Sequence, residues 1–322
     1  MTSRRSSRAP VALLLLIGMF VATMAGTLIA AKQSVAEVAR VPDVASVLSP
    51  PSSTVENFLL VGSDSRAGSD PNSPDYGGIG SADQTTGARS DTIMVLRRDR
   101  ATGEAALLSI PRDLWVEIAG TGRKNRINSA FGEGPAVLVQ TVQQSLGIPI
   151  HHYVEIDFSG FKSLVDAIGG VELCFLYPTR DKNTGLDVPE PGCFVMDGVQ
   201  ALAYARSRYF EQFIDGEWQV DGTADIGRTK RQQDFVNRAL QGAVADVKTN
   251  PFNAGRVIDE AGQAISIDDE LNLFQMASSL RGAVASGLQP KSLPVRGDTI
   301  DGKSVLLLSD GADEVLAFFA GS

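Results

Sequence analysis

The sequence predicts an α/β domain in which helices cover a central sheet, preceded by a single membrane-spanning helix. From about residue 55 onward, short apolar runs typical of strands alternate with stretches of helical periodicity, which is the pattern of a layered α/β fold. Near the N-terminus, a run of 21 residues, 11–31, carries no charge. With 43% hydrophobic residues, the 322-residue chain has the composition of a globular protein with a sizeable core.

The uncharged run 11–31 predicts a transmembrane helix, because at about 1.5 Å rise per residue it spans a hydrocarbon core of about 30 Å. Three arginines lie in the tail 1–10. The positive-inside rule therefore places this tail in the cytoplasm and the rest of the chain outside, as a single-pass protein of the cell membrane. A signal peptide cleaved within 25–31 is the alternative, and it would export the chain as well.

Composition also indicates the boundaries that follow. Residues 32–54 are rich in Ala, Val, Ser and Pro and predict a stalk. Residues 55–322 then form the extracytoplasmic domain. Inside it, residues 67–88 are rich in Gly, Ser, Asp and Pro without any period, which predicts a long exposed loop.

Apolar runs bounded by turn residues predict the strands. The run 57–61 ends at Gly62 and predicts a buried strand. The runs 92–96 and 105–110 flank the polar turn 100–103 and predict a hairpin. Apolar and polar residues alternate in 153–158, which predicts a half-buried strand. The remaining predicted strands are 171–175 and 304–308.

Helical spacing of apolar residues predicts the helices. The longest is 227–247, in which Val236, Leu240 and Ala243 belong to one apolar stripe. Asp197 is placed to cap the N-terminus of a helix that ends at 205. The other predicted helices are 135–146, 161–168, 268–280 and 312–319.

Charge and residue counts exclude several function classes. The net charge is −9, from 29 basic and 38 acidic residues, which argues against binding of nucleic acid. The only two histidines, His151 and His152, give little support to a zinc site or a Ser-His-Asp triad. Cys174 and Cys193 lie 19 residues apart in an exported domain, which favours one disulfide over the alternative of two buried thiols.

Polar clusters at strand ends and helix starts predict an anion site. Arginine offers planar, bidentate hydrogen bonds to phosphate oxygens and stays charged. Arg228, Arg231 and Gln232 share one face in the first turns of a helix, where the dipole also favours an anion. Side chains at strand ends converge on one crevice, so we expect a polyanionic ligand, with phosphate the best candidate. The clusters are 62–66, 89–92, 110–113, 204–208 and 225–232.

Two carboxylates, Asp64 and Asp91, stand beside these arginines and predict a divalent ion, Mg²⁺ or Mn²⁺, that offsets repulsion between carboxylate and phosphate. Any one cluster alone is more typical of a surface ion pair or a solvated helix face than of a functional site. Together they place at least seven arginines at element ends of an acidic protein, and this favours a functional site.

These clusters, in this order, resemble the LytR-CpsA-Psr family of cell-envelope proteins. The similarity covers residues 57–240 and is specific because it joins many motifs. The resemblance implies a three-layer α-β-α sandwich with a mixed central sheet and a deep apolar pocket for a polyprenyl chain. Besides the clusters above, the matching segments are SIPRD at 109–113, RINSAF at 126–131, HYVEIDF at 152–158 and DAIGGV at 166–171.

The resemblance also implies an activity, the transfer of a glycopolymer from a polyprenyl-pyrophosphate carrier to muramic acid of peptidoglycan through a phosphodiester bond. Asp64 and Asp91 would then hold magnesium. Arg89 and Arg112 would stabilise developing charge, and Asp225 would accept the proton, with Asp113 or a metal-held carboxylate as alternatives. The residues expected to bind the pyrophosphate are Arg89, Arg112, Arg206, Arg208, Arg228 and Gln232, with Arg66, Arg126 and Arg231 as further candidates.

Three alternatives remain open at this point. The same residues would serve a polyprenyl-pyrophosphate phosphatase that uses water as acceptor. A non-catalytic carrier-binding or regulatory protein would keep the arginines and the pocket but would not need Asp64 and Asp91 as metal ligands. The identity of the polymer is also open, although the Cys174–Cys193 pair resembles actinobacterial family members and makes arabinogalactan a candidate.

Overall fold

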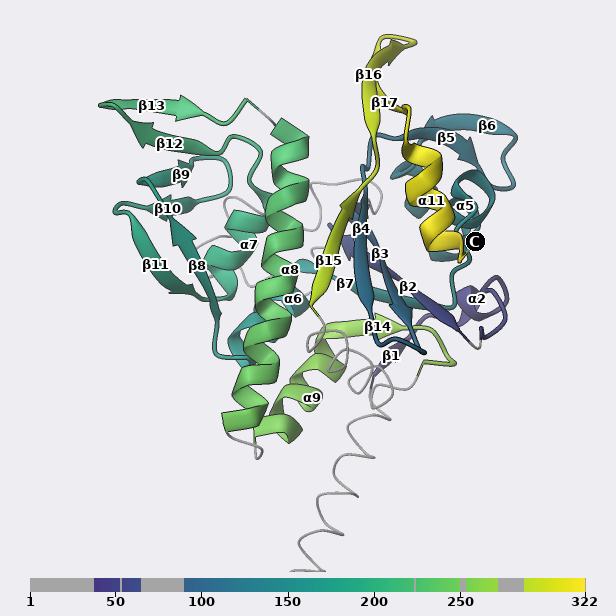
Figure 1. The fold of residues 1–322 in the computed structure, drawn as a ribbon, viewed down its shortest axis with the longest axis horizontal. Coiled ribbons are helices and arrows are strands. Elements are labelled where there is room, and N and C mark those ends of the chain that lie inside the picture. Colours follow the sequence, from purple (N-terminus) through teal and green to yellow (C-terminus); the bar gives the residue numbers. More distant parts are fainter. Residues whose placement is uncertain are drawn as a thin grey trace, which may run out of the picture.

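The fold is taken from a computed structural model that describes residues 38–52, 54–64, 90–222, 224–249, 253–271 and 287–321 (Figure 1). The predicted transmembrane segment 11–31, the loop 67–88 and most of the predicted helix 268–280 lie outside these residues. Among the helices that the structure describes, none is both long and apolar enough to cross a membrane.

A mixed sheet of seven strands forms the centre of the molecule, in the order β1-β14-β7-β2-β3-β4-β15. Its antiparallel middle is β2, β3 and β4, while β7 runs parallel to β2 and β15 parallel to β4. The mixed central sheet is therefore confirmed. The strands are β1 (Ala39–Arg40), β14 (Ile265–Ile267), β7 (His152–Ile156), β2 (Val55–Ser63), β3 (Ser90–Asp99), β4 (Ala105–Ile110) and β15 (Leu288–Ser292).

Helices cover both faces of this sheet. Leu59 and Val61 of β2 join a core with the layer formed by α2, α4, α5 and α11, whereas Phe58 packs on the opposite side. Because both faces are buried, residues 58–61 of β2 form a continuous apolar run. The first layer is α2 (Pro42–Ala45), α4 (Ser129–Gly132), α5 (Pro135–Leu146) and α11 (Ala312–Ala320); the second is α6 (Phe158–Ala167), α7 (Gly198–Arg206), α8 (Ala224–Thr249) and α9 (Asn253–Ala264).

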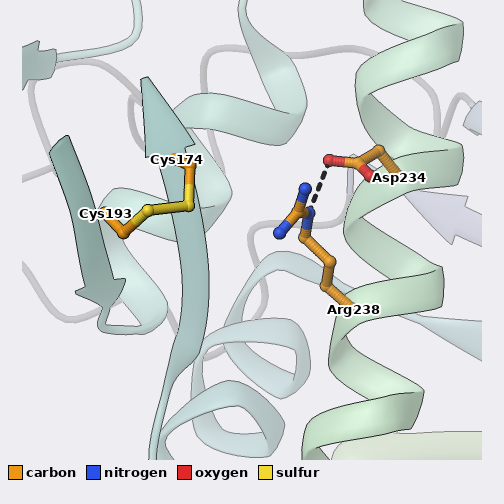
Figure 2. Close-up of a disulfide and its surroundings, with 4 residues drawn as sticks. All are labelled: Cys174, Cys193, Asp234 and Arg238. Atoms are coloured by element: carbon orange, nitrogen blue, oxygen red, sulfur yellow. Dashed lines mark hydrogen bonds and ion pairs between the residues drawn. A yellow bond between two sulfur atoms is a disulfide. The ribbon is translucent and has the colours of Figure 1, made fainter. Parts of the chain in front are cut away.

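A smaller lobe lies beside α8, on the left in Figure 1. Two strands, β8 (Val171–Phe175) and β11 (Gly192–Met196), pair antiparallel and are joined by the predicted Cys174–Cys193 disulfide, which is confirmed. Figure 2 shows this bridge between the two strands, and on the neighbouring α8 an ion pair of 2.8 Å between Asp234 and Arg238. A second small sheet has the order β10-β9-β12-β13, with β9 (Thr179–Asp181), β10 (Leu186–Val188), β12 (Glu211–Ile214) and β13 (Glu217–Val220).

Two hairpins complete the described fold. The hairpin of β5 (Trp115–Ile118) and β6 (Arg123–Arg126) packs beside α5. The hairpin of β16 (Val295–Ile300) and β17 (Lys303–Leu308) projects from the body at the top of Figure 1. Residue Leu306 of β17 bridges to Leu114, so this hairpin is attached to the loop that follows β4.

The structure corrects two predictions. Residues 32–54 were expected to be a stalk, but the fold includes 38–48: β1 pairs with β14, and Val44 of α2 is fully buried against the core. The run 153–158 was expected to be half-buried, but Tyr153 and Val154 are both buried because layers cover both faces of β7. The remaining strand and helix predictions within the described residues are confirmed to within a few residues.

Candidate active site

A cavity of about 730 Å³ lies between the central sheet and the helices α6, α8 and α9. Its walls are apolar over most of their length. The predicted apolar stripe of α8 lines the cavity through Val236, Leu240 and Ala243, facing Phe58 and Met94 on the sheet. The space is therefore shaped for a long hydrocarbon group, which would gain about 0.8 kcal/mol per buried methylene.

The polar end of the cavity follows from strand register. Gly62 of β2 lies opposite Thr92 of β3 and beside Ile156 of β7, and Ile93 lies opposite Ile110 of β4. The carboxyl ends of β2, β4 and β7 thus meet at one edge of the sheet, as expected for ligand sites of open α/β sheets.

Six predicted site residues come together at this edge. Arg228, only 4% exposed, enters from the first turns of α8, and the guanidinium of Arg206 lies 4.5 Å over the Phe158 ring. Gln232 donates from Nε2 to the carbonyl oxygen of Ala205 at 3.0 Å. The predicted residues that line the cavity are Asp64, Arg112, Arg206, Arg208, Arg228 and Gln232.

A buried carboxylate that sequence reasoning missed holds part of this cluster. Asp181 accepts hydrogen bonds at Oδ2 from Ser207 Oγ (2.7 Å) and from the backbone amides of Arg208 (3.1 Å) and Tyr209 (2.9 Å). Its Oδ1 accepts from the amide of Asn183 at 2.9 Å. Burial raises the pKa of Asp181, but these hydrogen bonds outweigh it and hold the pKa below the usual value.

Two predicted pyrophosphate ligands point elsewhere. Arg231 donates to Asp221 (3.0 Å) and to the carbonyl oxygen of Ser207 (2.7 Å), and its guanidinium covers the Phe210 ring. Arg126 donates to the carbonyl oxygen of Ser304 at 2.7 Å and lies 3.5 Å from Asp113. Neither arginine lines the cavity.

The remaining predicted residues are placed only in part. Arg66 and Arg89 lie outside the described residues, and for Asp91 and Asp225 only the backbone is described. Asp91 lies in β3 between Ser90 and Thr92, the partners of Ser63 and Gly62. The backbone therefore puts it on the strand next to Asp64, at the polar edge.

The described residues test the fit of a metal. No group of three or more His, Cys, Asp and Glu side chains gathers among them. Magnesium, however, is often bound by one or two carboxylates together with phosphate oxygens. Asp64 beside the arginines, with Asp91 on the neighbouring strand, fits that pattern.

A second charged network lies beside the cavity wall. His152, stacked on Phe58, lies 3.4 Å from both the Glu56 and the Asp268 carboxylates, and Arg98 and Arg100 also pair with Glu56. Burial lowers the pKa of His152, but the two carboxylates outweigh it and raise the pKa to about 9. Burial raises the pKa of Glu56, but hydrogen bonds from His152 and Arg100 bring the pKa down to about 2.

The described residues thus combine a mixed central sheet with an apolar cavity that has arginines at one end. The chain belongs to the LytR-CpsA-Psr family, since the sequence pattern of the LytR_cpsA_psr family matches residues 19–316. The similarity extends well beyond the segments quoted from the sequence alone.

Two relatives illustrate the membership. The chain is 37% identical over 239 residues to "Probable cell wall biosynthesis protein LcpB" of Corynebacterium glutamicum, covering 73% of this chain and 54% of LcpB. It is 33% identical over 243 residues to the polyisoprenyl-teichoic acid–peptidoglycan teichoic acid transferase TagU of Halalkalibacterium halodurans, covering 74% of each. The chain thus spans about half the length of LcpB and three quarters of TagU.

Solved structures share the fold. The LytR-Csp2A-Psr enzyme from Actinomyces oris has 24% sequence identity and a TM-score of 0.66, over 88% of this chain and 96% of that one. TagT bound to LI-WTA has 22% identity and a TM-score of 0.61, over 84% and 92%. These likenesses concern the architecture alone.

Proposed function

We propose that this protein transfers a glycopolymer from a polyprenyl-pyrophosphate carrier to muramic acid of peptidoglycan, forming a phosphodiester bond. One observation carries the proposal: an apolar cavity of about 730 Å³ opens onto a cluster of four arginines. The cavity suits the prenyl chain, and the arginines suit the pyrophosphate. The transferase names of relatives such as TagU support the same reaction.

The reaction is a displacement at the sugar-linked phosphorus. A muramic acid hydroxyl attacks this atom, the bond to the bridging oxygen breaks, and polyprenyl phosphate leaves with the electron pair. Arg112, Arg206, Arg208 and Arg228 bind phosphate oxygens and stabilise the charge that develops on them. The hydroxyl proton passes to a carboxylate, for which Asp225 and Asp113 are the candidates.

A magnesium ion completes the proposed site. Asp64 and Asp91 would hold it, and it would neutralise charge on the pyrophosphate. We expect Asp64→Asn to weaken the dependence of transfer on Mg²⁺, whereas Asp310→Asn, at an exposed turn, leaves it unchanged. Wild-type activity that is insensitive to chelator would remove the metal from the proposal.

The test uses the full chain in detergent with a synthetic polyprenyl-pyrophosphate-linked glycan, with and without peptidoglycan, and identifies products by mass. A phosphodiester-linked glycan on muramic acid is the expected product. Release of sugar phosphate without acceptor would indicate the phosphatase, and binding without turnover the carrier-binding protein. Arg112→Ala should abolish transfer, while Arg123→Ala, an exposed arginine of β6, serves as the matched control.

Anchoring in the cell membrane through residues 11–31 belongs to the same proposal, because a membrane-bound carrier must be reached from the membrane surface. Arabinogalactan stays a candidate polymer, and the acidic composition keeps nucleic acid outside the proposal.

A further inference from the structure

The small sheet β10-β9-β12-β13 has one buried and one solvent-facing side. On the buried side lie Thr179 and Asp181 of β9, and Leu186 and Val188 of β10. Since side chains alternate along a strand, the residues between them point outward. Register places the outward residues Asp187, Arg180, Glu211 and Val220 in one row, with Phe213 and Trp218 as the next pair.

This outward side carries a group of flat side chains that contact one another. The guanidinium of Arg180 lies 3.8 Å over the Trp218 ring and is fixed by Glu211, whose Oε2 accepts from Nε at 2.6 Å. The Phe213 ring follows at 5.4 Å from Trp218. Phe213 is 39% and Val220 55% exposed, so the surface is open to solvent. We call Arg180, Phe213, Trp218 and Val220 the aromatic face.

The small sheet borders the polar end of the cavity at the end where β9 finishes and β12 begins. Asn183 and Thr184, in the turn after β9, line the cavity, and so does Tyr209, which is 61% exposed just before β12. Phe213 follows Tyr209 by four residues, about 13 Å along an extended strand at about 3.3 Å per residue. A glycan that leaves the arginine cluster past Tyr209 would reach the aromatic face over this end of the sheet.

The net charge of the small sheet favours one kind of glycan over another. Apart from Asp181, which is buried on the opposite side, its segments 179–188 and 211–220 contain two basic residues, Arg180 and Lys182, and four acidic ones, giving +2 − 4 = −2. The only outward arginine is already paired with Glu211. An acidic surface repels a polymer with repeating phosphates, whereas aromatic rings bind the apolar C–H faces of uncharged sugars.

We propose that the aromatic face binds the uncharged sugars of the carrier-linked donor as they leave the cavity, so that the glycan transferred is a neutral polysaccharide and not a phosphate-repeating polymer. This inference rests on the proposed function. It assigns Trp218 as the principal stacking residue, because Arg180 and Phe213 both pack against it.

Three donors with the same polyprenyl pyrophosphate test it: one with a single sugar, one with a neutral oligosaccharide and one with a glycerol-phosphate oligomer. For the full chain, we expect the neutral oligosaccharide to be the preferred donor. Trp218→Ala should raise its KM about tenfold, and the KM of the single-sugar donor less than twofold. Trp218→Phe, which keeps a ring, should recover most of the loss.

Phe318→Ala is the matched control, since Arg97 stacks 4.3 Å over this partly exposed ring on α11 in the same way. It should change none of the three KM values. Equal effects of Trp218→Ala on the single-sugar and the oligosaccharide donors would overturn the inference. A wild-type preference for the glycerol-phosphate donor would overturn it as well.

A binding experiment with an oligosaccharide that lacks the carrier distinguishes failure of this inference from failure of the proposed function. The chain has two tryptophans, so a neutral oligosaccharide titrated into wild type and Trp218→Ala reports on this ring by fluorescence. Saturable quenching that Trp218→Ala abolishes would keep the sugar site even if no donor were turned over. Absence of binding in the wild type would overturn it.

Discussion

Replacing Asp181 tests how the structure holds its arginine cluster. This carboxylate is fully buried and accepts four hydrogen bonds, three of them from the segment 207–209 that carries Arg208 into the cavity. Asp181→Ala removes all four acceptors. It leaves the donors of residues 183 and 207–209 without their acceptor. The substitution should therefore lower the stability of the fold and displace Arg208.

The magnitude follows from the number and kind of these bonds. A hydrogen bond to a charged group contributes about 1.5–3 kcal/mol, but such values do not add, and amides near the surface regain water. We therefore expect Asp181→Ala to lower the free energy of unfolding by about 3–5 kcal/mol. Asp181→Asn can turn its carbonyl oxygen to the three donors of 207–209 and lose only the Asn183 bond, which costs about 1.5 kcal/mol.

Acid dependence gives a second readout for Asp181. Its pKa is lower in the folded chain than in the unfolded one, so its contribution is present above the unfolded value of 3.8 and is lost as pH falls through the folded pKa. Asp181→Asn, which cannot ionise, should lack this part of the acid dependence.

The assay combines urea unfolding of the full chain with donor kinetics. If Asp181 positions Arg208, the Asn variant should raise the donor KM about tenfold with a smaller change in kcat. Asp187→Asn, an exposed carboxylate on the neighbouring β10, is the control and should match wild type. The reasoning would be refuted if Asp181→Ala unfolded within 1 kcal/mol of wild type, on the order of one hydrogen bond, with an unchanged donor KM.

Three further predictions concern other parts of the chain. Arg228→Ala should lose transfer while keeping the fold. Arg231→Ala should lower the free energy of unfolding by about 2–4 kcal/mol, because Arg231 donates to the Asp221 carboxylate and the Ser207 carbonyl oxygen; turnover and urea titration measure the two effects. His152→Gln should lower the free energy of unfolding by up to about 3 kcal/mol at pH 6. In wild type the contribution of His152 is complete below the unfolded pKa of 6.5 and is lost as pH rises through the folded pKa of about 9. Thermal melting across that pH window would measure this loss. Cys174→Ser should cost about 3 kcal/mol, since the bridge to Cys193 closes a loop of 19 residues; equal denaturation midpoints with and without reductant would contradict this.

The central elements were predictable because their signals are local. The strand 105–110 and the helix 135–146 match β4 and α5 residue for residue, since an apolar run or stripe ends at a clear turn signal in each. In α5 that signal is Gly147, which takes the left-handed conformation at φ 68°.

The small sheet gave no such signal. β9 and β10 have three residues each, and β12 and β13 mix charged and aromatic residues without a regular period. Asp181 is equally hidden, because its hydrogen-bond partners lie up to 28 residues away in the sequence. For the same reason, residues 38–48 look like a linker until α2 is seen packed on α5.

Helix geometry explains why the three residues predicted to share one face of α8 do not all line the cavity. At 3.6 residues per turn, successive residues are about 100° apart, so Arg231 and Gln232 lie on opposite sides of Arg228. Gln232, about 40° from Arg228, still reaches the cavity. Arg231, about 60° away on the other side, instead reaches Asp221 and the Ser207 carbonyl.

This division gives Arg231 a function even though it does not line the cavity. Gln232 binds the carbonyl oxygen of Ala205, and Arg231 binds that of Ser207, so α8 holds the backbone on both sides of Arg206. The Arg206 side chain is thereby directed over the Phe158 ring at the polar end of the cavity. Two polar side chains of one helix thus hold the backbone around Arg206, while Arg228, between them, lines the cavity together with Gln232.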